Sequence, residues 1–89
     1  MGDYVNDINT ILFEYLKNEK YANAEKVALS LIKKNPNNST IWGILGGIYL
    51  INKNYSKAIE ACKKYIEILP NDPEGYNNLG YIFLNTSNN

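Results

Sequence analysis

The sequence predicts an all-α fold in which five helices form antiparallel hairpins that stack side by side. Two observations predict it. Apolar residues recur at intervals of three and four along five segments, as they do on one face of an amphipathic helix. The chain also repeats itself after 34 residues, so that Tyr15 aligns with Tyr49 and Pro36 aligns with Pro70. A repeat of this length indicates that one supersecondary unit is used more than once.

The first hairpin is expected at residues 5–17 and 21–34. Its first helix is predicted from the helical spacing of Ile8, Ile11, Leu12, Tyr15 and Leu16. Its second helix is predicted from the spacing of Tyr21, Ala24, Val27, Ala28, Leu31 and Ile32. The residue before a proline avoids the α region, so Pro36 ends this helix.

The second hairpin, residues 40–51 and 55–69, repeats the arrangement, and a fifth helix is expected at residues 73–85. Asn54 suits the N-cap of the fourth helix, and Asp72 suits that of the fifth. Because the turns between the helices are short, neighbouring helices should be antiparallel.

The third helix is unusual because it contains Gly43, Gly46 and Gly47, and an interior glycine costs about 1 kcal/mol relative to alanine. The apolar run 41–51 that surrounds them is well short of the ~20 residues that cross a bilayer. We therefore expect a buried helix and no membrane association.

The composition argues against several other classes of protein. The chain has nine lysines, nine acidic residues, no arginine and a formal net charge of zero, unlike a nucleic-acid-binding domain. A single cysteine forms no internal disulfide, and the N-terminal residues resemble no secretory signal, so a cytoplasmic protein is expected.

Catalytic chemistry is also not expected. The chain has no histidine, no Cys/His cluster with zinc spacing and no glycine-rich phosphate loop. Cys62 falls on the predicted core face, where a cysteine acts as a small apolar side chain. We therefore predict no enzyme activity, no catalytic residues, no metal and no cofactor.

Residues 39–72 contain the pattern Trp42-x-x-Leu45-Gly46-x-x-Tyr49, followed by Ala58, Cys62 and Pro70. This pattern resembles the tetratricopeptide repeat (TPR), W-x₂-L-G-x₂-Y…A-x₃-F…P. Residues 5–38 resemble a more degenerate copy, and residues 73–86 resemble the first helix of a third copy, a half repeat that acts as a cap. The resemblance implies a single domain over residues 1–89: a right-handed α-solenoid of about two and a half repeats.

Two positions depart from the family pattern. Cys62 stands where a large aromatic residue is usual, and Tyr65 stands where alanine is frequent, so the two changes are expected to compensate in volume. Gly46 is expected to face Ala58 in the core, and Gly80 is expected to have the same role in the last helix.

The resemblance also implies a concave groove lined by the first helices of successive repeats. Carried onto this chain, the groove residues are Asn9, Phe13, Gly43, Ile44, Gly47, Ile51, Asn77, Asn78 and Tyr81. Gly43 and Gly47 would leave a bare floor that admits a bulky side chain or a partner helix. The alternative is that both glycines only ease packing against Phe13 and Tyr81.

The predicted function is therefore a protein-interaction module and scaffold that binds an apolar or helical peptide segment in this groove. Some relatives clamp acidic C-terminal peptides with basic residues. None of these nine residues is basic, and Lys17, at the end of the first helix, is the only basic residue at the other positions that the resemblance turns toward the groove, so an acidic partner is not expected. Two alternatives stay open. One is a self-assembling unit, domain-swapped or joined through the apolar C-terminal helix, and the other is the docking arm of a larger enzyme.

Overall fold

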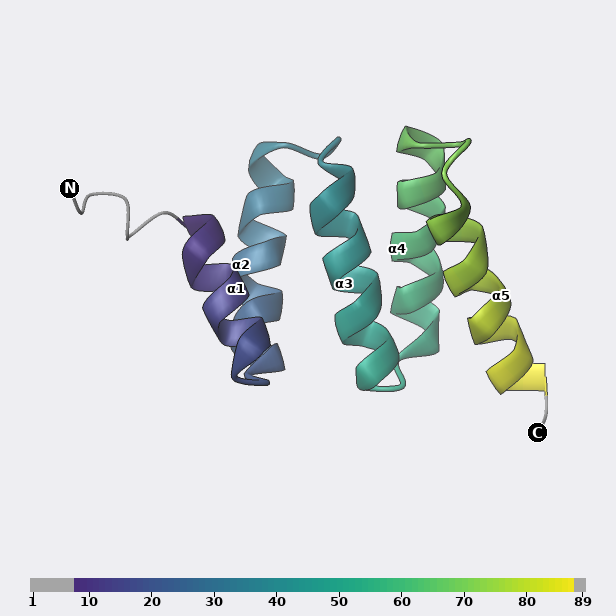
Figure 1. Cartoon of the computed structure of the whole chain (residues 1–89), viewed down its shortest axis with the longest axis horizontal. Coiled ribbons are helices and arrows are strands. Elements are labelled where there is room, and N and C mark those ends of the chain that lie inside the picture. The colour runs from purple at the N-terminus through teal and green to yellow at the C-terminus, as the bar shows by residue number, and fades with distance from the viewer. Residues whose placement is uncertain (1–7, 88–89) are drawn as a thin grey trace.

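The computed structural model describes residues 8–87, which form an all-α helical repeat. The five helices of this range are α1 (Ile8–Lys17), α2 (Tyr21–Lys34), α3 (Ser39–Ile51), α4 (Tyr55–Ile68) and α5 (Pro73–Ser87). They alternate in direction, with α1, α3 and α5 nearer the viewer in Figure 1 and α2 and α4 behind them. Residues 5–7 of the predicted first helix lie outside the described range. The other helices lie where the sequence predicts them, and the largest difference is the extension of α5 to Ser87.

Three of these helices are preceded by a residue whose side chain caps the helix N-terminus. The predicted caps are confirmed: Asn54 Oδ1 accepts from the Lys57 N–H at 3.3 Å, and Asp72 Oδ1 accepts from the Glu74 N–H at 2.9 Å. Asn38 makes the same kind of bond at the start of α3, which is why α3 begins one residue earlier than predicted.

The turns inside the two hairpins have the same backbone geometry. Glu19 and Lys53, 34 residues apart, are both in the left-handed region, with φ of 58° and 59°. After each of them a backbone N–H returns to a carbonyl of the last turn, from Lys20 to Tyr15 and from Asn54 to Tyr49, both at 2.8 Å. This is the helix-ending motif that normally uses glycine. A side chain in this conformation costs roughly 1–2 kcal/mol.

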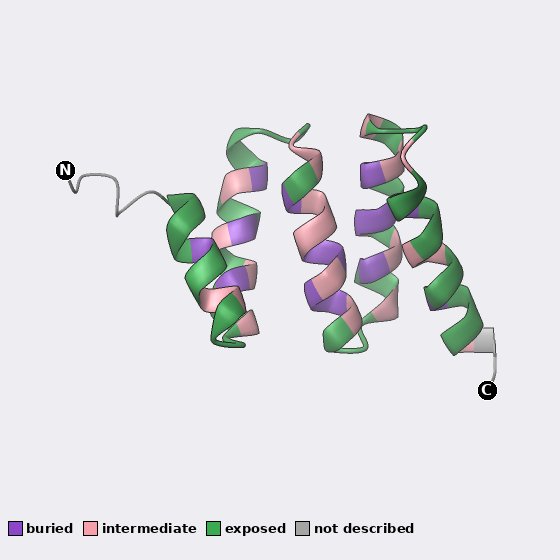
Figure 2. Cartoon of the chain, viewed as in Figure 1, coloured by how far each residue is buried: buried purple, intermediate pink, exposed green. Residues whose placement is uncertain are grey.

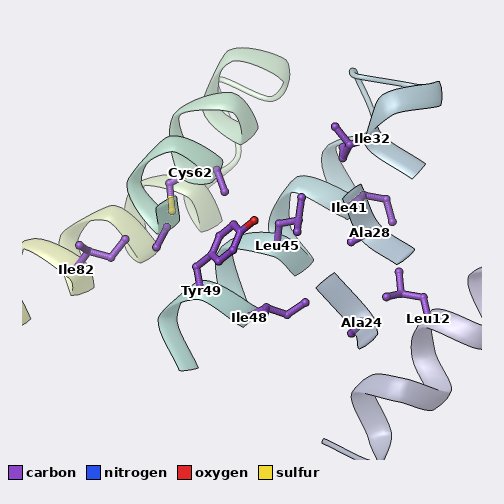
Figure 3. Close-up of a cluster of buried hydrophobic side chains, with 12 residues drawn as sticks. Leu12, Ala24, Ala28, Ile32, Ile41, Leu45, Ile48, Tyr49, Cys62 and Ile82 are labelled. Atoms are coloured by element: carbon purple, nitrogen blue, oxygen red, sulfur yellow. The ribbon is translucent and has the colours of Figure 1, made fainter. Parts of the chain in front are cut away.

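The core is a continuous apolar layer between the helices. Leu12, Leu45, Ile48 and Ile82 are the largest fully buried side chains. Figure 3 shows Leu45 and Tyr49 in the middle of this cluster, between residues of α2 and α4. Buried residues are most frequent in α2, α3 and α4, whereas the end helices α1 and α5 are mainly exposed (Figure 2). The main helix contacts join neighbours in sequence, and the stack extends 50 × 26 × 19 Å.

Two expectations about core glycines need correction. A Cβ on Gly46 would meet Ala61 Cβ at 3.7 Å and Cys62 Sγ at 3.9 Å, so Gly46 faces these residues and not Ala58. The crossing of α3 and α4 therefore sets a register about one turn away from the one expected. Gly80 has no core role, because no neighbouring helix of the described chain comes within 4 Å of its Cβ position. No helix of the described part is long and apolar enough to cross a membrane.

Candidate functional site

The surface formed by α1, α3 and α5 has two hollows, one on each side of Thr40. The first lies between α1 and α3, has a volume of about 260 Å³ and is lined by Asn9, Phe13, Asn38, Thr40 and Ile41. The second lies between α3 and α5, has a volume of about 280 Å³ and is lined by Thr40, Gly43, Ile44, Tyr65 and Glu74. Small-molecule pockets usually measure about 300–1,000 Å³. Each hollow is therefore better suited to one side chain of a larger ligand.

The structure brings four of the nine predicted groove residues to these hollows. Asn9 and Phe13 line the first, and Gly43 and Ile44 line the second. The other five line neither hollow: Gly47, Ile51, Asn77, Asn78 and Tyr81. The exposed fractions of Phe13, Ile51 and Tyr81 are 55%, 55% and 56%, so large apolar side chains of α1, α3 and α5 are open to solvent.

The prediction that Gly43 leaves the groove surface free of side-chain atoms is wrong. A Cβ there would lie 3.4 Å from Cε2 of Tyr65, a residue of α4 whose ring reaches between α3 and α5. The same ring approaches Gly75 of α5, where a Cβ would lie 3.0 Å from Tyr65 Cδ1. Two glycines thus make room for an aromatic ring at a position where the family pattern has alanine. At Gly47 nothing lies within 4 Å of the Cβ position, but Gly47 lines neither hollow.

Tyr65 is held rigidly where it lines the second hollow. Its hydroxyl donates to Asp72 Oδ2 at 3.0 Å, while the other carboxylate oxygen of Asp72 caps α5. Burial, followed by this hydrogen bond, raises the pKa of Tyr65. The side chain therefore remains a neutral hydrogen-bond donor at physiological pH, and the hollow has a fixed aromatic floor. One signal in the sequence pointed to this feature: a large residue stands at a position where small residues are usual, and both flanking helices contain glycines.

The hollows contain little charge. Glu74 is the only charged residue that lines either of them. Lys17 lies exposed at the far end of α1. The described residues contain no group of three or more His, Cys, Asp or Glu placed to hold a metal ion. Cys62 is buried, and burial raises the pKa of its thiol, which disfavours the reactive thiolate.

A third hollow lies beside Trp42 on the α4 side of the molecule and was not predicted. Its lining residues are Trp42, Glu60, Lys63, Lys64 and Glu67. The Trp42 indole N–H donates to the Pro36 carbonyl at 2.7 Å, and Lys64 pairs with Glu67 at 3.8 Å. Because both signs of charge are present and both are exposed, this hollow selects no particular charge on a ligand.

Comparison with known protein families gives two matches. One family model described as tetratricopeptide repeat matches residues 14–73, which is more than half of the chain. A second model with the same description matches residues 61–89. No curated protein matches the chain.

Proposed function

The chain belongs to the tetratricopeptide repeat family, whose members generally mediate protein–protein interactions, and from that premise we propose that it is a non-catalytic binding module. Its partner is a protein segment that lies across α1, α3 and α5 and places side chains in the two hollows beside Thr40. The observation that carries this proposal is the pair of adjoining hollows on one surface, one of which is lined by the exposed ring of Phe13.

An apolar partner is supported by what the surface leaves exposed. Phe13, Ile51 and Tyr81 each leave more than half of the side chain in solvent. Covering the exposed part of one such side chain contributes about 1 kcal/mol. An amphipathic helix or an extended segment with large apolar anchors can cover several of them together. The fixed ring of Tyr65 adds a preorganised surface for one anchor, which lowers the entropic cost of binding.

An acidic partner is disfavoured by the charges at the same surface. Glu74 would face an acidic segment in the second hollow, and like charges brought together weaken binding. No lysine lines either hollow to offset this repulsion. We therefore expect weak affinity for peptides with acidic C-termini, and tight, salt-sensitive binding of such a peptide would contradict this part of the proposal.

The test is to select peptides from a random phage-displayed library on the full chain. We expect the selected peptides to be rich in aromatic and large aliphatic residues and poor in acidic ones. Fluorescence anisotropy then measures their affinity for variants. Phe13→Ser should weaken binding about tenfold, equivalent to about 1.4 kcal/mol.

Leu29→Ser is the matched control, because Leu29 is also exposed, at 46%, but belongs to α2 and lines a hollow on the α4 side of α3. It should leave binding unchanged. The groove proposal is refuted if Leu29→Ser weakens the selected peptides and Phe13→Ser does not.

A second candidate function is self-assembly. It is favoured by one observation, the large apolar side chains that α5 leaves exposed, Tyr76, Phe83 and Leu84.

A further inference from the structure

Helix α5 buries one face and leaves another open. Ile82 is fully buried on the face that packs against α4. On the open face, the exposed fractions of Tyr76, Phe83 and Leu84 are 52%, 52% and 66%. Gly80 lies among them, with nothing within 4 Å of its Cβ position. Spacings of three and four residues align Tyr76, Gly80, Phe83 and Leu84 along one side of the helix, and we call these four residues the α5 stripe.

The same molecule shows what covers a stripe of this kind. The residues 34 positions earlier are Trp42, Gly46, Tyr49 and Leu50 of α3. There α4 packs against Gly46 through two small side chains, Ala61 and Cys62, and Tyr49 is only 7% exposed. A glycine flanked by large apolar residues is thus covered in this fold by a helix that presents small residues opposite the glycine.

A second copy of α5 meets this requirement. Gly80 is itself the small residue, and Tyr76 and Leu84 lie four residues to either side of it. In an antiparallel pair with Gly80 against Gly80, Tyr76 of each copy faces Leu84 of the other. Glycine at the crossing permits the close end of the 8–10 Å range of helix separations. Between Gly75 and Ser87 the helix carries no charge, as is typical of interface cores.

We propose that the chain forms a symmetric homodimer in which the two α5 stripes pack antiparallel about Gly80. This proposal rests on the self-assembly role above. The contact uses the same patch on both copies, so it closes at two subunits and does not extend into a filament. No residue of the α5 stripe lines either of the hollows beside Thr40, so both hollows of each copy stay open in the dimer. The dimer therefore presents two grooves, which raises the avidity for a partner with two binding segments.

Sedimentation equilibrium of the full chain over roughly two orders of magnitude in concentration tests the dimer. The wild-type mass should rise from monomer to dimer. Gly80→Lys should stay monomeric, with the dimer dissociation constant raised about a hundredfold, because two ammonium groups would meet at the two-fold axis. The side chain enters open space in the monomer, so circular dichroism should show a folded helical protein.

Gly47→Lys is the matched control, since Gly47 is also mid-helix with nothing within 4 Å, but belongs to α3. It should dimerise as the wild type does. A wild-type mass that stays monomeric, or a Gly80→Lys variant that dimerises normally, would overturn the proposal. Either result leaves the groove proposal intact if the selected peptides still depend on Phe13. If the wild-type chain dimerises but does not bind the selected peptides, the groove proposal alone is refuted.

Discussion

Replacing Gly75 by alanine should destabilise the protein, because α5 crosses α4 too closely there for a side chain. Gly75 is buried in the first turn of α5. An added Cβ would stand 2.6 Å from Cγ1 of Ile66 and 3.0 Å from Cδ1 of Tyr65, whereas carbon atoms pack best at about 3.5–4.0 Å. Cγ1 is bonded directly to the Cβ of Ile66, so it moves away only if Ile66 changes its χ1 rotamer or α5 shifts.

The expected loss follows from two opposing effects. Overpacking of this kind costs about 1–3 kcal/mol. The better helix propensity of alanine returns at most about 1 kcal/mol. The free energy of unfolding should therefore fall by about 1–2 kcal/mol, and the melting temperature should fall by roughly 5–15 °C for a domain of this size.

Thermal and urea unfolding followed by circular dichroism measure this change. Gly47→Ala is the control: its Cβ meets nothing, so it should stabilise the protein by up to about 1 kcal/mol. Ile66→Ala removes the closest clashing atom and leaves only the 3.0 Å approach to Tyr65, so Gly75→Ala should cost less in that background. If Gly75→Ala stabilises as Gly47→Ala does, or costs the same with and without Ile66, the close approach is not the cause.

Three other features give measurable consequences. Lys53→Gly should raise the urea midpoint by the equivalent of about 1 kcal/mol, because glycine relieves the left-handed backbone there, and an unchanged midpoint would argue against strain. Asp72→Ala should lower the free energy of unfolding by about 2 kcal/mol and Asn54→Ala by about 1 kcal/mol. The difference is expected because both side chains cap a helix, but only Asp72 also accepts a hydrogen bond from a tyrosine hydroxyl; equal losses would contradict this explanation. Burial and the hydrogen bond to Glu25 raise the pKa of Tyr49 from 10.0 to about 12. The stability that this raised pKa provides is therefore complete below pH 10 and is lost as the pH rises through 12. Tyr49→Phe should reduce the decline in the free energy of unfolding between these two pH values. An identical decline in the variant would refute the assignment of this pH dependence to Tyr49.

The helices could be predicted because their signals are local. Apolar spacing, the prolines and the side chains of Asn54 and Asp72 act within one or two turns of the backbone, and the 34-residue repeat adds a second, independent constraint. The left-handed turns at Glu19 and Lys53 gave no such signal, because glycine is the residue that normally marks them.

The candidate site was harder to predict because it depends on how helices cross. The family pattern predicted a groove along α1, α3 and α5, and residues of these three helices line the two hollows. It did not indicate that Tyr65 of α4 reaches between them, or that Gly46 faces Ala61 and not Ala58. A shift of one turn in the register of two helices exchanges such partners, and the periodicity of a single helix does not determine that register.

Because the main contacts join only helices that are neighbours in sequence, α1 and α5 are linked only through the helices between them in the 50 Å stack. We expect opening to begin at the ends, with amide hydrogen exchange fastest in α1 and α5 and slowest where α3 meets α4. For the same reason, bending the stack requires only small changes at each junction. A segment bound along α1, α3 and α5 would hold the stack at one curvature. It would therefore slow amide hydrogen exchange in both end helices at the same time.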